Sequence, residues 1–167
     1  MALDSGSPSS PVDSEDSCNT YTVDTPENGS PKQGPCWSTS CLTTGLMAVS
    51  ERGNETGRVP CIRVLEPGWN TIRILGVCSG LGPVLTCPWG LCIDRDGDVL
   101  VADWGKQHHR VLIYPSKGVG RPLVSDNLNS PRGLALLPDG HMVVSDSMNH
   151  CIKIYQLEYI PLQGRKG

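Results

Sequence analysis

Acidic residues in a short alternating run are the first side chains of this 167-residue sequence that suggest chemistry. Asp94, Asp96 and Asp98 flank Gly97 in the manner of calcium ligands. A helix–loop–helix calcium site places glycine sixth and glutamate twelfth in its loop, between two helices. Here the glycine is fourth, no such glutamate follows and apolar runs of strand type flank the loop. The pattern therefore favours a tight turn over a metal site.

The cysteines and histidines lack the spacing of a metal or nucleophile site. Structural zinc sites usually use closely paired ligands, but none of the eight cysteines forms a Cys-x-x-Cys pair. His109 and His150 recur one repeat apart, which does not bring them together. No nucleophile elbow or phosphate-binding glycine loop is present. We therefore expect no catalytic residue, no metal and no cofactor, and a protein that is not an enzyme.

A second group of side chains has the chemistry of binding. Tryptophan and arginine dominate the energetics of protein interfaces, and aromatic rings with positive charges also bind RNA. Trp89, Trp104 and Arg132 are the expected anchors, although Trp89 has an alternative role as a packing residue between repeat units. The full set of binding candidates, expected at strand ends and loops, is Trp89, Trp104, Lys106, His108, His109, Arg110 and Arg132.

These candidates lie in a stretch that occurs twice, at 88–103 and 131–146, with an offset of 43 positions. Each copy reads as an apolar run, a turn containing Asp-Gly, and a second apolar run, which predicts a hairpin. A third run, rich in Val, Ile and Tyr, follows each hairpin, as is typical of strands. Residues Pro122–Ser125 are a candidate fourth strand of the first copy, and four strands in about 43 residues describe one blade of a β-propeller. The matched positions are Gly90 and Gly133, Gly97 and Gly140, and Asp103 and Asp146.

The repeated residues are expected to be structural because catalytic groups rarely need to recur. Asp103 and Asp146 end the second strand of each unit, where a carboxylate can accept hydrogen bonds from the backbone of the next loop. Gly90 and Gly133 are expected where the innermost strands crowd one another.

The motifs between Cys87 and Tyr155 resemble the NHL repeat. They are Pro-x-Gly-Leu, Asp-x-Asp-Gly, Val-x-Val-Ala-Asp and His-Arg-Val-x-x-Tyr, and the tripeptide that names the family is approximated by residues 149–151. The resemblance implies an all-β fold, a partial β-propeller of about three four-stranded blades with a disordered N-terminal tail.

The same resemblance implies a non-enzymatic protein–protein interaction module. Ubiquitin-linked NHL proteins suggest that it recruits substrates for ubiquitin-dependent degradation, with the ligase supplied in trans because no RING pattern precedes the repeats. Two alternatives remain open, an RNA-binding propeller and a channel-site enzyme formed only when an oligomeric ring closes.

Composition divides the chain into five parts. Residues 1–33 carry six acidic side chains against one lysine among Ser and Pro, which predicts a disordered tail. Residues 34–86 are expected to form a degenerate first blade, 87–129 a second blade, and 130–162 a third whose last strand is uncertain. Residues 163–167 are expected to be a flexible C-terminus.

Three blades leave apolar sheet faces uncovered, because repeat units cannot bury these faces alone. A partner protein or a second copy in a two-fold dimer is therefore expected. The sequence shows no secretory signal and no run of about 18 apolar residues, which predicts a cytoplasmic protein with no membrane association.

Overall fold

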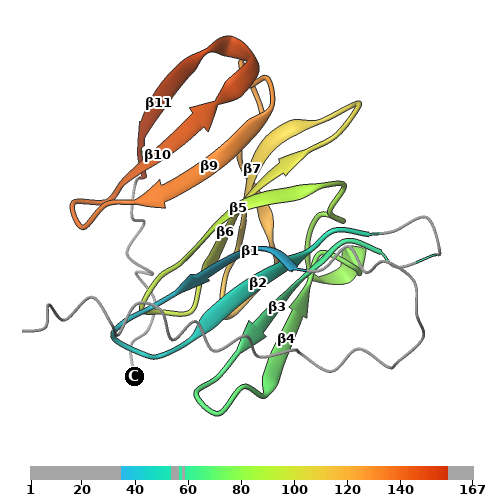
Figure 1. Ribbon diagram of the computed structural model, residues 1–167, viewed down its shortest axis with the longest axis vertical. Helices are drawn as coiled ribbons and strands as arrows, with labels where there is room; N and C mark the ends of the chain where they lie inside the picture. Colours follow the sequence, from blue (N-terminus) through green and yellow to red (C-terminus); the bar gives the residue numbers. More distant parts are fainter. Residues whose placement is uncertain (1–34, 54–56, 58, 158–167) are drawn as a thin grey trace, which may run out of the picture. The chain divides into compact units, whose positions relative to one another are not determined.

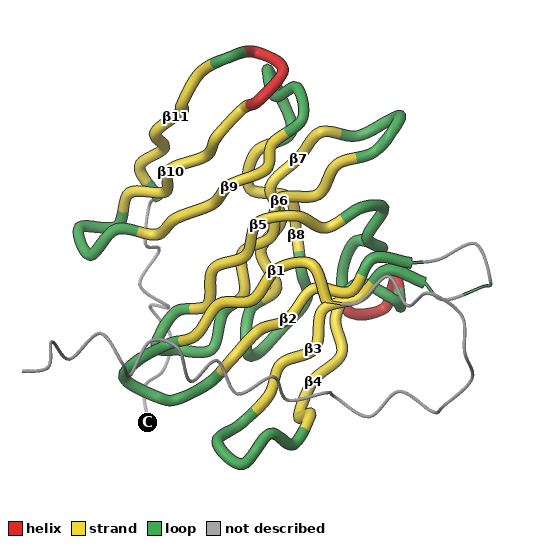
Figure 2. Tube along the Cα trace, viewed as in Figure 1, coloured by secondary structure: helices red, strands yellow, loops and turns green. Residues whose placement is uncertain are grey.

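The computed structural model describes residues 35–53, 57 and 59–157. The predictions for 1–33, for a strand at 158–162 and for 163–167 lie outside these residues. The described residues form eleven strands in three antiparallel sheets. Their arrangement can be followed in Figure 1. The only helical pieces of the described residues are two short 3-10 turns, drawn red in Figure 2. The described chain is therefore all-β, as predicted, and it contains no helix long and apolar enough to cross a membrane.

The first sheet has the strand order β1-β2-β3-β4, so each strand pairs with its neighbour in sequence. Its strands are β1 (Pro35–Ser40), β2 (Met47–Glu51), β3 (Cys61–Leu65) and β4 (Thr71–Leu75). The innermost strand, β1, was not predicted, because its sequence has little apolar character and no Asp-Gly turn follows it.

The second and third sheets repeat the same antiparallel pattern. The second consists of β5 (Pro88–Ile93), β6 (Val99–Trp104), β7 (His109–Tyr114) and β8 (Arg121–Val124). The third consists of β9 (Pro131–Leu136), β10 (His141–Asp146) and β11 (Cys151–Gln156). The first strands of consecutive sheets contact each other, β1 with β5 and β5 with β9, so the second sheet packs between the other two.

The turn between β5 and β6 is the tight hairpin that the sequence predicts. Gly97 has φ 83° and donates its N–H to the Asp94 carbonyl at 3.1 Å. The Asp94 carboxylate accepts the N–H groups of Asp96 and Asp98, each at 2.9 Å, which fixes the turn. Gly140 has φ 87° in the corresponding turn of the third sheet. The glycines supply the backbone conformation that other residues rarely adopt.

Two apolar cores lie on opposite faces of the second sheet, which explains the unbroken apolar run of β6. Val99 and Val101 belong to the core shared with the first sheet, and Leu100 to the core shared with the third. Strand β10 instead alternates: Met142, Val144 and Asp146 are fully buried, and the other three residues of the strand are half-buried. The third sheet therefore buries only one of its faces against the rest of the described chain.

Gly90 lies where β5 and β9 approach most closely. A Cβ atom at Gly90 would stand 2.2 Å from the Arg132 carbonyl oxygen, so the predicted crowding of innermost strands is found here. Gly133 differs, because its nearest neighbour would be the Ser145 hydroxyl of its own sheet at 2.8 Å. That hydroxyl accepts the Gly133 N–H at 2.7 Å, so Gly133 makes room for a contact within one sheet.

Candidate functional site

Asp103 fastens the start of the second sheet to the end of β6. Its buried carboxylate accepts the N–H groups of Thr86 and Cys87 at 3.0 and 2.9 Å, and it accepts Arg110 Nε and Nη2 at 3.1 and 3.0 Å. The sequence correctly predicts that this carboxylate accepts hydrogen bonds from backbone N–H groups, but it places those groups in the loop after β6. The N–H groups belong to the loop that enters the sheet, because β5 is antiparallel to β6 and Pro88 pairs with Asp103. We call this arrangement an aspartate clasp.

Asp146 forms the same clasp in the third sheet. Its carboxylate accepts the N–H of Asn129 at 2.7 Å, the Asn149 side-chain amide at 2.7 Å and the Lys153 ammonium at 2.9 Å. Burial alone would raise the pKa of Asp146, but these three hydrogen bonds hold it below its ordinary value. Lys153 stands 43 positions after Arg110, so the cation of the clasp recurs as well.

The first sheet carries an ion pair at the corresponding strand, Glu51 Oε1 with Arg63 Nε at 2.6 Å. At this end of its strands, each sheet therefore has one acidic side chain that forms an ion pair with a basic side chain of the same sheet. Arg110 was predicted to bind a partner, and the structure commits its guanidinium to Asp103 with 15% of the side chain exposed. A binding role for Arg110 stays a prediction.

Beside the clasps, aromatic and arginine side chains from all three sheets meet around Trp89. Its ring centroid is 6.3 Å from that of Trp37 and 6.5 Å from that of Trp104. The guanidinium carbons of Arg52 and Arg132 lie over its ring at 3.8 and 4.6 Å from the centroid, in cation–π geometry. We call the whole group the Trp–Arg cluster: Trp37, Arg52, Trp89, Trp104, His109 and Arg132.

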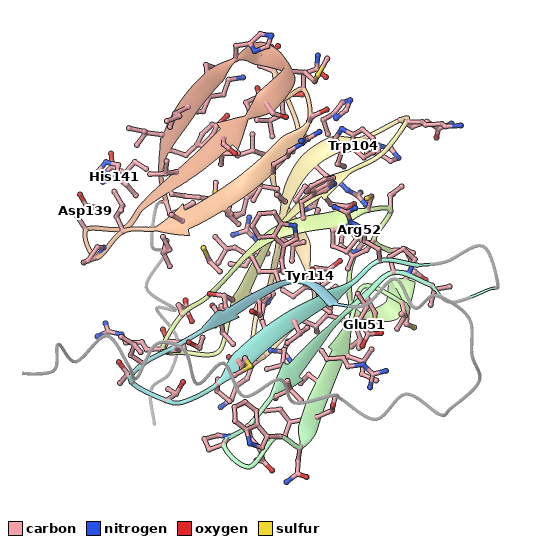
Figure 3. All side chains as sticks on the ribbon, in the orientation of Figure 1. Glu51, Arg52, Trp104, Tyr114, Asp139 and His141 are labelled. Carbon is pink, nitrogen blue, oxygen red and sulfur yellow. The ribbon has the colours of Figure 1, made fainter. Side chains whose placement is uncertain are left out.

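Ser130 orients one edge of the cluster. The Trp104 indole N–H donates to the Ser130 hydroxyl, and the Ser130 N–H donates to His109 Nδ1 at 3.1 Å. The rings of Trp104 and His109 lie 6.4 Å apart. Ser130 has φ 64°, so the loop before β9 is shaped to present both groups to these rings. Trp104 and Arg52 can be followed in Figure 3.

The structure brings together four of the seven predicted binding residues and leaves three outside the cluster, one of which is Arg110, paired with Asp103. Trp89, Trp104, His109 and Arg132 belong to it, whereas Lys106 and His108 are exposed in the turn between β6 and β7.

Trp37 and Arg52 were missed. Arg52 follows Glu51 as Trp104 follows Asp103, so alignment of the first sheet with the second could have found it. Trp37 lies on β1, the strand that the sequence did not reveal.

Polar atoms in the cluster are incompletely paired. Arg52 Nε and Trp89 Nε1 are buried and have no hydrogen-bond partner within the described residues. Arg52 and Arg132 form no ion pair with any described acidic group, in contrast to the cations of the three sheets described above. The cluster thus combines aromatic surface with positive charge and spare donors.

Comparison with known proteins places these features in a family context. The NHL repeat model matches residues 85–114 and 128–155. The human (Homo sapiens) NHL-repeat-containing protein 4 is 34% identical over 124 residues, which cover 74% of this chain and 92% of that protein. Its mouse (Mus musculus) counterpart is 32% identical over 124 residues, covering 74% and 83%. The human E3 ubiquitin-protein ligase TRIM32 is 41% identical over 69 residues, which cover 41% of this chain and only 10% of the ligase.

Proposed function

This chain belongs to the NHL-repeat family, and on that premise we propose that it is a non-enzymatic protein-interaction module whose docking face is the Trp–Arg cluster. The cluster is the observation that carries the proposal. Three tryptophans and two arginines from three sheets meet at one end of their strands. Tryptophan and arginine are the residues that most often dominate the binding energy of protein interfaces.

Exposure of the cluster supports a binding role in addition to the contacts that Trp89 makes between the three sheets. None of the three tryptophans belongs to either apolar core of the described chain. Trp37 is 41% exposed and Arg132 is exposed, so the cluster reaches solvent. Trp89 and Trp104 are half-buried, so the exposed aromatic surface of the cluster is that of Trp37, beside the exposed Arg132.

Photo-crosslinking tests the proposed face on the full chain. We place the crosslinking amino acid benzoylphenylalanine at Trp37, with the same substitution at Val119 as the matched control. Val119 is 60% exposed in the turn between β7 and β8, away from the cluster. We expect discrete protein adducts from position 37 only, with loss of the adducts in an Arg52→Gln/Arg132→Gln background. Equal adducts at both positions, or none at position 37, would contradict the proposal.

A link to ubiquitin is the finer part of the proposal. The similarity to TRIM32 covers only a small part of that ligase, so this chain would recruit a substrate while a ligase acts in trans. The ubiquitin content of a crosslinked partner, measured in cells with and without the chain, tests this part. If the ubiquitin content of the partner is the same with and without the chain, the proposed link to ubiquitin is wrong, but the proposed docking face is not affected.

A second copy of the chain is the partner that we propose for the third sheet. Ile152 and Ile154 of β11 are 70% and 65% exposed, on the face opposite to the one packed on the second sheet. Ile72 and Ile74 of β4 are 46% and 43% exposed on the first sheet. A two-fold dimer would make the contact between these two patches twice and cover both.

The mass of the full chain by light scattering tests the dimer under reducing conditions. We expect the wild type to have twice the mass of one chain, and the double variant Ile152→Lys/Ile154→Lys to have the mass of one chain. Leu42→Lys, at a fully exposed position in the turn between β1 and β2, is the control and should leave the dimer intact. A monomeric wild type would exclude self-association, whereas the docking face does not depend on it.

A further inference from the structure

We infer that the Trp–Arg cluster recognises an acidic peptide segment, in which an Asp or Glu carboxylate meets Arg52 and Arg132 and an apolar neighbour packs on Trp37. The inference rests on the proposed docking face and specifies the chemistry of its partner. It follows from the charge, the hydrogen-bond donors and the aromatic surface of the cluster.

Charge is the first argument. Among the described residues, the acidic groups Glu51, Asp103 and Asp146 at this end of the three sheets are paired with other cations, Arg63, Arg110 and Lys153. Arg52 and Arg132 remain unpaired within the described residues, and both lie over the ring of Trp89. Two like charges held over one ring repel each other, and an anion placed beside both would remove that repulsion.

The hydrogen-bond donors give the second argument. Arg52 Nε and Trp89 Nε1 are buried donors without an acceptor in the described part of the chain. Buried donors normally have a partner, and leaving them unpaired is unfavourable. A carboxylate has only acceptors and about four lone-pair sites, so one such group can serve several N–H donors. Hydrogen bonds between arginine and a carboxylate are also among the strongest in proteins.

The extent of the positive charge favours a peptide over RNA. An RNA backbone needs many cations along its path, but residues 34–167 contain 13 basic and 11 acidic side chains. Arg110 is neutralised by Asp103, and Lys106 stands outside the cluster. Two guanidiniums that have no ion-pair partner among the described residues, beside exposed Trp37, suit a short segment with one or two carboxylates and one apolar anchor.

A phage-displayed library of random 12-residue peptides, selected on the full chain, tests the inference. We expect enrichment of peptides with Asp or Glu next to an aromatic or aliphatic residue. Binding of a selected synthetic peptide, followed by fluorescence anisotropy, should weaken about tenfold or more in Arg52→Gln and in Arg132→Gln. Exchange of the peptide's Asp and Glu for Asn and Gln should have the same effect on the wild type. Arg121→Gln removes an exposed arginine of β8 and should bind as the wild type does.

Each outcome separates the inference from the proposed function. Selected peptides that need Trp37 but lack acidic residues would overturn the inference and leave the docking face standing. Peptides that bind equally well to Trp37→Ala and to both arginine variants would overturn the face as well. A 12-nucleotide single-stranded RNA that binds through Arg52 and Arg132, with no acidic peptide selected, would replace the peptide as occupant. The unfolding midpoint of every variant shows whether lost binding reflects a lost fold.

Discussion

Replacing Asp103 with alanine should destabilise the protein by about 3–5 kcal/mol. The substitution removes the acceptor of the Thr86 and Cys87 N–H groups and leaves the guanidinium of Arg110, only 15% exposed, without its carboxylate. Losing the partner of a buried donor costs about 1–3 kcal/mol, and an uncompensated buried charge accounts for the rest. Asp103→Asn keeps the shape and one acceptor oxygen, so we expect a smaller loss of about 1–3 kcal/mol.

Urea denaturation of the full chain, followed by tryptophan fluorescence, measures these changes. Asp126→Ala is the control, because Asp126 is exposed, and it should change the free energy of unfolding by no more than about 0.5 kcal/mol. The double variant Asp103→Ala/Arg110→Ala removes the stranded charge together with its partner. Its loss should fall short of the sum of the single losses by about 1–3 kcal/mol.

Two results would refute this reasoning. A loss below about 1 kcal/mol for Asp103→Ala would show that the clasp contributes little to stability. Strict additivity in the double variant would show that Asp103 and Arg110 act independently, despite their 3.0 Å contact.

Three further predictions follow from single contacts. Gly90→Ala should cost about 1–3 kcal/mol in urea denaturation, because its Cβ would meet backbone at 2.2 Å, while Gly80→Ala, with only ordinary contacts, should not. Burial raises the pKa of the Cys92 thiol to about 11, so iodoacetamide at about pH 8 should label exposed Cys151 and spare Cys92 until urea is added, as peptide mapping by mass spectrometry would show. The pKa of Asp146 is lowered in the folded state, so its contribution to stability is present above about pH 4 and is lost as the pH falls further; urea midpoints between about pH 5 and 3 should therefore drop less in Asp146→Asn than in the wild type.

The sequence predicts strands and hairpins best where the structure depends on neighbouring residues of the same segment, as at turn glycines and in apolar runs. Gly97 and Gly140 mark hairpins because positive φ is a property of the turn itself. The apolar run of β6 predicts a buried strand because side chains on both of its faces leave water. The strand β1 escaped prediction because its pairing with β2, rather than its own polar sequence, makes it a strand.

The candidate site could be predicted only in part, for a related reason. Trp89, Trp104 and Arg132 stand out by residue type alone. Their meeting with Arg52 depends on contacts between β5 and the neighbouring sheets, which no local pattern encodes. The commitment of Arg110 to Asp103 likewise depends on strand pairing, since the two residues stand opposite each other on β6 and β7.

The aspartate clasps join residues that are close in sequence, and this has a consequence for how the protein is made. Asp103 reaches back 16 and 17 positions to Cys87 and Thr86, and Asp146 reaches back 17 positions to Asn129. Contacts of such short range form early and fast, because little chain entropy is lost in closing the loop. In the second and third sheets, the entry loop can therefore be fixed as soon as the second strand of the sheet, which ends in the clasp aspartate, has left the ribosome.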